Sequence, residues 1–234
     1  MRKLQHSLYE MERPPGAERF VFAILAGAWV ALAWYLLLGG GLAKAGGWLG
    51  QDWSAGDPIR RICLAVAFFI YYIRTLFTVF VFQKRGMGWG SFFGITTWTL
   101  CIYIFLAILA ETDHRPLGYA AGAGLVLFAV GSWMNSYAEY ARGVWKQLPQ
   151  NRGRFYSGGL FRYSRHPNYL GDLLSFSGLS LVAGSWISFA IPLLMLTGFV
   201  FVNIPLLDSH LHDHYGAAFD QYANRTPKLI PFLY

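Results

Sequence analysis

An arginine stands in the middle of a long apolar segment of the sequence. Arg74 occurs in FFIYYIRTLFTVFVF, where an unpaired charge in lipid would cost at least about 2.5–3.5 kcal/mol. Its side chain must therefore face protein or water, either as a structural group tied to carbonyls or to an acid such as Glu139, or as a wall of a polar cavity. Tyr71 shares a helical face with Arg74, and Tyr72 lies on the same turn. Most buried tyrosines only satisfy their hydroxyl locally, but one beside a cation could donate a proton to a substrate.

Two polar residues lie near the end of another apolar segment. Asn135 and Glu139 are four residues apart, so both side chains project from one face of a helix. Polar groups at that depth need partners. The pattern leaves open whether the partner is a ligand or a neighbouring helix.

A basic stretch with several glycines follows, from Arg142 to Arg165. It contains six Lys or Arg residues and no acid. The usual excess of positive residues on the inner side of a membrane accounts for part of this charge. Gly153, Gly158 and Gly159 favour a further role, because glycine lets the backbone approach a ligand closely or adopt positive φ.

The segment after this loop combines a proline with three polar side chains. Because the residue before a proline avoids the helical region, we expect irregular backbone from Pro167 to Gly171. Such backbone is tolerated near a membrane only where protein or a polar cavity surrounds it. Asp172 then begins the next helix, where the helix dipole favours an anion. It could act only as a cap, or it could bind a ligand amide or hydroxyl together with His166 and Asn168.

The tail contains the string LLDSHLHDHYGAAFDQY, which is rich in histidine. His210 and His214 have the i,i+4 spacing of metal ligands on a helix, but no general-base glutamate lies between them as zinc proteases require. We therefore expect no metal here. The segment is interpreted as a helix packed over the membrane face, or as a lid over a ligand.

The elements that must position these residues are membrane-spanning helices. The chain has 234 residues, of which 55% are hydrophobic and only 13% charged, whereas soluble domains are roughly one quarter charged. A transmembrane helix needs about 20 apolar residues. The sequence predicts a single all-α membrane domain over residues 1–234 with about six transmembrane helices, the clear ones at 20–40, 61–82, 90–110, 118–138 and 187–206. The sixth segment, at about 173–184, is shorter and can form a hairpin with the span at 187–206.

Lysine and arginine are distributed unequally between the loops. With the N-terminus inside, fourteen of these residues fall in inner segments and four in outer ones. Since positive residues are retained on the cytoplasmic side, both termini and the basic loop are predicted to be cytoplasmic. This distribution accounts for the net charge of +7 without nucleic acid as a partner.

The strings GGLFRYSRHPNYLGD and HYGAAFDQYANRTPKLIPFLY resemble the C-terminal half of the steroid 5α-reductase family, including its uncharacterised bacterial branch. The resemblance extends through VGSWMNSYAEY and, more faintly, YYIRTLFTVFVFQKRG, so it covers roughly residues 70–234. RHPNYLGD is also similar to a string in sterol Δ14-reductases, and a looser form occurs in isoprenylcysteine and phospholipid methyltransferases. The resemblance implies a cofactor-binding half at residues 135–234 and a place in a bacterial inner membrane.

The reductase resemblance also implies an NADPH site and a catalytic tyrosine. Tyr71 matches the family's catalytic tyrosine, with Tyr72 beside it and Arg74 one turn away. Glu139 stands where the steroid enzymes have aspartate, and Lys146 where they have arginine. The residues that the resemblance assigns to NADPH are Asn135, Glu139, Lys146, Arg154, Asn168 and Asp172, with Arg165 and His166 of the shared string, and with His210 and Tyr215 closing over the cofactor from the tail.

Two features separate a reductase from a methyltransferase. NADPH carries roughly four negative charges and S-adenosylmethionine a net positive charge, so a loop with cations and no acid suits NADPH. The methyltransferases resemble one another in two adjacent glutamates before the final helix, where this chain has Leu207 and Asp208. The favoured function is therefore NADPH-dependent reduction of a polarised carbon–carbon double bond in a lipid-soluble, steroid-like or isoprenoid-like substrate.

The substrate, the complete proton-donating arrangement and the oligomeric state stay open. The steroid enzymes carry a glutamate in an earlier span that acts with the tyrosine, and residues 20–40 contain no acid. A methyltransferase of the isoprenylcysteine or phospholipid type is the first alternative. A non-enzymatic membrane scaffold is the second, and it requires the polar residues of 135–172 to be purely structural.

Overall fold

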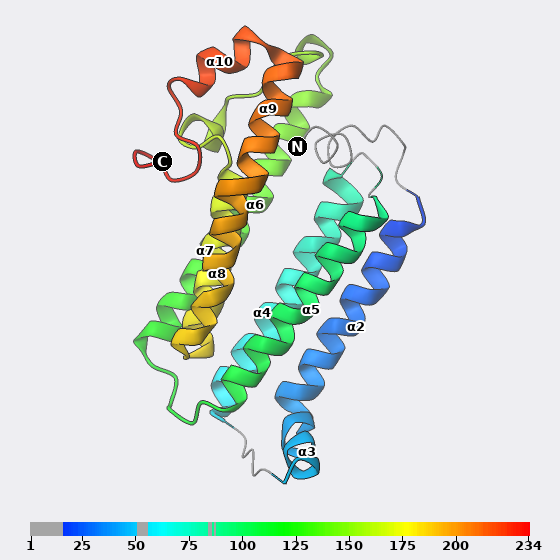
Figure 1. Cartoon of the computed structure of the whole chain (residues 1–234), viewed down its shortest axis with the longest axis vertical. Coiled ribbons are helices and arrows are strands. Elements are labelled where there is room, and N and C mark those ends of the chain that lie inside the picture. Colours follow the sequence, from blue (N-terminus) through cyan, green and yellow to red (C-terminus); the bar gives the residue numbers. More distant parts are fainter. Residues whose placement is uncertain (1–15, 51–55, 84–85, 87) are drawn as a thin grey trace.

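The computed structural model describes residues 16–50, 56–83, 86 and 88–234. Within these residues every regular element is helical (Figure 1). The longer helices are α2 (Glu18–Leu38), α3 (Gly41–Trp48), α4 (Pro58–Phe77), α5 (Trp89–Glu111), α6 (Tyr119–Gln147), α7 (Pro167–Ala183), α8 (Ala190–Gly198), α9 (Ile204–Tyr215) and α10 (Ala217–Ala223). Short π-helical turns, η1 (Thr78–Phe82) and η5 (Phe199–Asn203), extend α4 and join α8 to α9. The 3-10 turns are η2 (Pro149–Asn151), η3 (Gly159–Arg162) and η4 (Trp186–Phe189).

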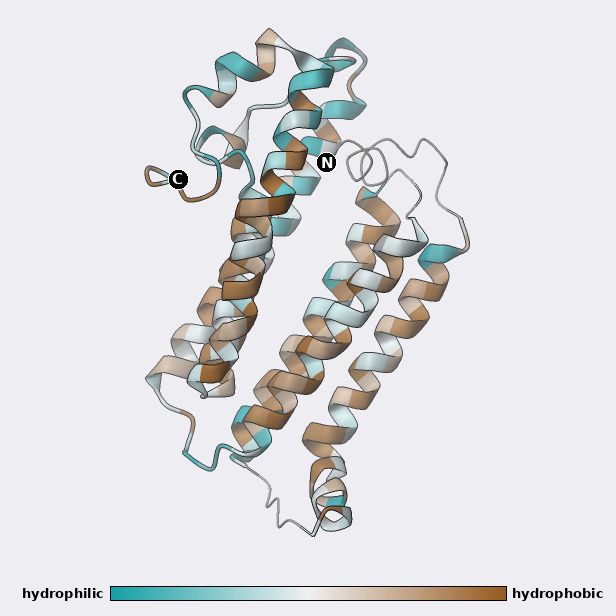
Figure 2. Ribbon diagram, in the orientation of Figure 1, coloured by the Kyte–Doolittle hydropathy of each residue, from teal (hydrophilic) through white to brown (hydrophobic). Residues whose placement is uncertain are grey.

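Four continuous helical segments of the described chain are long and apolar enough to cross a membrane. They are Glu18–Leu38, Pro58–Phe82, Phe92–Glu111 and Trp186–Tyr215, and Figure 2 shows apolar residues over much of each of them. Large apolar side chains on them are exposed, such as Ile24 at 71% and Phe201 at 74%, which suits contact with lipid. The prediction of an all-α membrane protein is confirmed.

The other two predicted spans are also helices. α6 has 29 residues and runs well past the predicted segment 118–138, and α7 has 17 residues and begins before the predicted 173–184. Neither is among the four segments that meet the length and hydropathy requirement. α6 and α7 instead pair closely with each other beside the spans (Figure 1).

Four glycines allow this close pairing. Gly124 and Gly131 of α6 face Gly178 and Gly171 of α7, and each pair on one helix is seven residues apart, which places both on the same face. A Cβ added at Gly124 would lie 2.6 Å from the carbonyl oxygen of Gly178, and one at Gly171 would lie 2.6 Å from that of Gly131. Small residues thus let the two backbones approach, as at helix contacts in membranes.

Replacing Gly131 with alanine is expected to push α6 and α7 apart, because the new Cβ would meet the Gly171 carbonyl and the Ser175 amide. Overpacking of this kind typically costs about 1–3 kcal/mol. The measurement is the thermal unfolding midpoint of the purified protein in detergent. Gly122→Ala is the control, since an added Cβ at Gly122 on the same helix meets nothing within 4 Å. Equal midpoints for the two variants would contradict the glycine contact.

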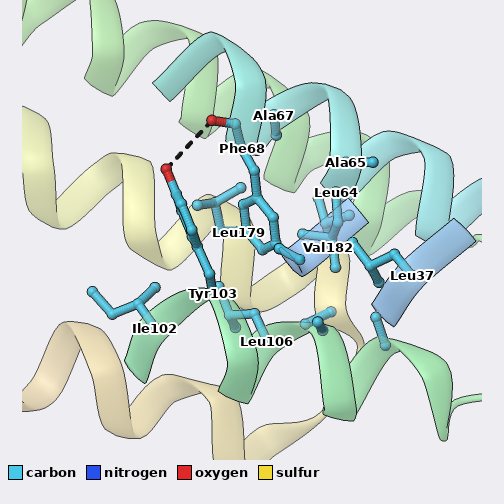
Figure 3. Packing of buried hydrophobic residues seen from close by; sticks show 14 of the residues in the cluster. Leu37, Leu64, Ala65, Ala67, Phe68, Ile102, Tyr103, Leu106, Leu179 and Val182 are labelled. Atoms are coloured by element: carbon cyan, nitrogen blue, oxygen red, sulfur yellow. Dashed lines mark hydrogen bonds between the residues drawn. The ribbon is translucent and has the colours of Figure 1, made fainter. Parts of the chain in front are cut away.

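The main apolar core joins α7 to the helices of the other half. Phe68 of α4 and Tyr103 of α5 stack with ring centroids 4.5 Å apart, and Leu179 and Val182 of α7 pack beside them (Figure 3). The Tyr103 hydroxyl donates a hydrogen bond to the Phe68 carbonyl, at 3.4 Å. This core fixes α7, which carries candidate site residues, against α4, which carries Tyr71 and Arg74.

Buried Arg60 holds together the end of the bundle away from α10. Its guanidinium donates to the carbonyls of Val182 and Arg115, at 2.6 and 3.1 Å, and pairs with Asp113 at 3.2 Å. Burial opposes ionisation of Asp113, but hydrogen bonds from Arg115 and the nearby charges outweigh it, so the pKa of Asp113 lies below its usual value. Arg60 is thus a structural cation that ties α4 to the end of α7.

Candidate active site

Arg74 forms a buried ion pair between α4 and α7. Its Nη2 lies 2.8 Å from Oδ1 of Asp172, and the two side chains are 9% and 22% exposed. The suggestion that Glu139 neutralises Arg74 is therefore wrong. The Arg74 guanidinium carbon also lies 4.5 Å from the centre of the Tyr71 ring, at cation–π distance.

The start of α7 explains why Asp172 reaches Arg74. The helix begins with Pro167, so the expectation of irregular backbone from Pro167 to Gly171 is wrong. The restriction imposed by the proline falls only on His166, which has φ −129° and ψ 59°, whereas proline itself suits the first position of a helix. Asp172 consequently lies one full turn beyond the first residues of α7, on the same face as Asn168.

The surroundings of Tyr71 and Arg74 are apolar on one side and polar on the other. The Tyr71 ring makes edge-on contacts with Tyr103 and Phe176, with centroids 6.3 and 5.2 Å away. Nη1 of Arg74 is buried and has no hydrogen-bond partner among the described residues. A buried donor left unpaired is costly, so this nitrogen is suited to donate a hydrogen bond to an oxygen of a bound molecule or of water.

Two asparagines and Glu139 form a second polar group where α6 meets α7. The side-chain amide of Asn135 donates to the backbone carbonyl of Asn168 at 3.1 Å, and the side-chain amide of Asn168 donates to Glu139 Oε1 at 3.2 Å. The other oxygen of Glu139 pairs with Arg142 on the same helix. The structure thus brings Asn168 to the pair of Asn135 and Glu139 that the sequence analysis had placed on one helical face, with Asp172 one turn from Asn168.

Arg165 and His166 are joined to Asp208 of α9. Arg165 Nη1 lies 2.8 Å from Oδ2 of Asp208, and His166 Nε2 lies 3.0 Å from Oδ1. His166 is only 1% exposed and stacks on Tyr169, which in turn stacks on Phe199 of η5. These contacts tie the loop before α7 to the last long helix, so both residues are engaged in fixing the fold at this point.

An open cleft of 420 Å³ lies between the basic loop and the tail. Arg154 comes from the loop, while Tyr215 and Arg225 come from the end of α9 and from the residues after α10. Lys146, in the last turn of α6, donates a hydrogen bond to the Tyr215 hydroxyl at 3.2 Å. The described residues that line the cleft include no carboxylate; they are Gly153, Arg154, Phe155, Ser157, His214, Tyr215, Ala218, Tyr222 and Arg225.

Tyr72 and His210 complete the predicted site residues. The Tyr72 hydroxyl donates to the Ala23 carbonyl of α2, at 3.1 Å, so this ring serves the contact between α2 and α4. His210 stacks on His214 with centroids 6.2 Å apart, and only His214 lines the cleft. Sequence reasoning had missed Arg225 as a site residue, because it appeared only as one of many inner cations.

Known proteins resemble the chain along most of its length. The family described as "Protein of unknown function (DUF1295)" matches residues 9–226. Steroid 5-alpha-reductase DET2 of Solanum lycopersicum is 32% identical over 203 residues, which are 80% of this chain and 73% of that protein. 3-oxo-5-alpha-steroid 4-dehydrogenase 2 of Homo sapiens is 27% identical over 191 residues, which are 79% of this chain and 72% of that protein.

A methyltransferase is also similar to part of the chain. The protein named Probable O-methyltransferase ustE, of Ustilaginoidea virens, is 38% identical over 101 residues. These residues are 43% of this chain, and they span only 34% of that protein. Similarity to the reductases therefore covers most of both chains, whereas similarity to this methyltransferase covers a part of each.

Proposed function

Because the chain belongs to the DUF1295 family and has steroid 5-alpha-reductase relatives over most of its length, we propose that it is a membrane-embedded, NADPH-dependent reductase. The proposed substrate is a lipid-soluble, steroid-like or isoprenoid-like molecule with a carbon–carbon double bond polarised by a carbonyl. The observation that carries the proposal is the Tyr71–Arg74–Asp172 group, which is embedded between α4 and α7 and has a guanidinium nitrogen with no hydrogen-bond partner in the described part of the chain.

The chain's polar side chains fit a dinucleotide. Arg154 and Lys146 supply positive charge for phosphates beside Tyr215, and the group of Asn135, Glu139 and Asn168 supplies amides and a carboxylate for hydroxyls. Bound NADPH would supply the hydride, as redox cofactors carry the chemistry that side chains cannot. In this proposal residues 135–234 form the cofactor-binding half, at the cytoplasmic side of a bacterial inner membrane.

Tyr71 is proposed as the donor to the substrate carbonyl. Its ring is held by Tyr103, Phe176 and the Arg74 guanidinium, which restricts the direction of the hydroxyl. Nη1 of Arg74 offers a second donor, and Asp172 fixes the guanidinium through its other nitrogen. Donors placed before reaction in an apolar, water-poor site stabilise developing negative charge on an oxygen effectively.

A thermal-shift comparison of NADPH, NADH and S-adenosylmethionine on the detergent-purified protein tests this proposal. A ligand that binds only the folded state raises the unfolding midpoint, and the gain at 100 times Kd is about 2.7 kcal/mol. NADPH is expected to raise the midpoint more than NADH does, and S-adenosylmethionine is expected to leave it unchanged. A rise with none of the three would favour a membrane scaffold and would end the proposal.

A methyltransferase is the second candidate, supported by the partial match to ustE and by a further relative. Protein-S-isoprenylcysteine O-methyltransferase of Schizosaccharomyces pombe is 28% identical over 75 residues, which are 32% of each chain. The cleft argues against this candidate, because arginines without a carboxylate suit an anion better than a sulfonium ligand. A thermal shift with S-adenosylmethionine alone would reverse the ranking.

A further inference from the structure

The cleft between the basic loop and the tail has a strongly one-sided charge. Arg154 and Arg225 line it from two segments far apart in the sequence, and His214 adds an imidazole ring. Both arginines are exposed, so their guanidinium groups remain available to a ligand that enters from solvent. Two forked donors that reach one cleft from different segments are suited to a phosphate group, which guanidinium binds in a bidentate manner.

The backbone turn at Gly153 directs the loop along the cleft. Gly153 has φ 72°, in the left-handed region where glycine is favoured, and an added Cβ there would meet nothing within 4 Å. The Arg154 amide then donates to the Asn151 carbonyl at 3.1 Å, which closes the turn. Arg154 is therefore presented by an ordered turn of the backbone.

Aromatic rings form the remaining walls of the cleft. Phe155 lies against Tyr215 and Tyr222, with centroids 5.4 and 4.8 Å away. The Tyr222 hydroxyl donates to the Phe161 carbonyl at 2.6 Å, and the residue is only 3% exposed, so Tyr222 is a fixed part of the base of the cleft. Burial raises the pKa of Tyr222, which keeps this hydroxyl protonated as a donor. Aromatic faces beside cations suit a nucleobase next to its phosphates.

We propose that this cleft binds the adenosine end of the cofactor, and that Arg154 and Arg225 together recognise the 2′-phosphate that distinguishes NADPH from NADH. The proposal deepens the proposed function and rests on it. Arg225 is then a specificity-determining residue, which acts through the phosphate and takes no part in the reduction. A lipid phosphate is the competing ligand for the same chemistry, and the aromatic walls favour the nucleotide.

Binding of nucleotide fragments to the full chain in detergent tests this inference directly. The probes are 2′,5′-ADP and 5′-AMP, measured by calorimetry, together with NADPH and NADH. Wild-type protein is expected to prefer 2′,5′-ADP. Arg225→Ala and Arg154→Ala should each weaken the affinity for 2′,5′-ADP and for NADPH by roughly 10-fold or more, because a charge-assisted hydrogen bond is lost. The affinity for NADH should stay within about twofold of wild type.

Arg162→Ala is the matched control, because Arg162 is exposed in the same basic loop but does not line the cleft. The affinity of Arg225→Lys for 2′,5′-ADP and NADPH should lie between those of wild type and Arg225→Ala, since lysine keeps the charge but not the forked geometry. Unchanged NADPH affinity in both alanine variants would overturn the inference and leave the proposed function standing. Failure of the wild type to bind any of the four nucleotides would overturn both.

Nanodiscs separate the nucleotide from a lipid headgroup. In discs of phosphatidylcholine and in discs that contain phosphatidylglycerol, 2′,5′-ADP is expected to bind with similar affinity. Loss of 2′,5′-ADP binding by the wild type in the anionic discs would assign the cleft to a lipid phosphate and overturn the inference.

Discussion

Tyr71→Phe is expected to lower the turnover number for reduction of an α,β-unsaturated, lipid-soluble ketone by about 10²–10⁴-fold, the range typical of a lost general acid. The affinity for NADPH should stay within about twofold of wild type, because the ring, and with it the contacts to Tyr103 and Phe176, is retained. The measurement is NADPH oxidation over a panel of such ketones, with NADPH binding followed separately.

Tyr72→Phe is the matched control for this experiment. The Tyr72 hydroxyl donates to the Ala23 carbonyl, so its loss should cost one hydrogen bond, about 0.5–1.5 kcal/mol of stability, and leave turnover near wild type. Full activity in Tyr71→Phe would remove Tyr71 from the mechanism. Loss of activity in Tyr72→Phe alone would assign the proton-donor role to Tyr72.

The Arg74–Asp172 pair is expected to serve both stability and activity, and a double-mutant cycle separates the two. Arg74→Met or Asp172→Leu alone should destabilise the protein by about 3–5 kcal/mol, because each leaves a buried charge without its partner. The double variant should recover most of this loss, since two apolar side chains can replace a buried ion pair. Unfolding midpoints in detergent provide the stability measurement.

Activity is expected to behave differently from stability in the same set of variants. Reduction should stay absent in the double variant, because the Nη1 donor of Arg74 is missing even when the fold is restored. Recovery of reductase activity together with stability would mean that the pair is purely structural. The cycle therefore decides between the two roles of an intramembrane arginine.

The proposed reductase differs from the steroid enzymes in the acid that accompanies the tyrosine. The resemblance implies a glutamate in an earlier span; residues 20–40 contain none, and the acid of the observed span Glu18–Leu38 is Glu18, its first residue. In the structure Asp172 of α7 pairs with Arg74, which in turn lies against the Tyr71 ring. Among the described contacts Asp172 pairs with Arg74, and a substrate other than a steroid is compatible with this arrangement.

Several features of this protein followed from the sequence because they depend on local properties. The helical membrane class and the positions of four of the six predicted spans follow from hydropathy over about 20 consecutive residues. The shared face of Tyr71 and Arg74 and that of Asn135 and Glu139 follow from helical spacing alone. The one local error, at Pro167, arose because a restriction on the residue before proline was extended to the residues after it.

The partners of these residues were decided only by the tertiary structure. The sequence offers several acids to Arg74, and the close contact of Gly131 with Gly171 sets the register of α6 against α7, while the core around Phe68 and Leu179 sets α7 against α4. That register brings Asp172 to Arg74, and the fold of the tail brings Arg225 into the same cleft as Arg154. Such pairings join residues far apart in the chain, and they depend on how all helix faces pack at once, which no short stretch of sequence contains.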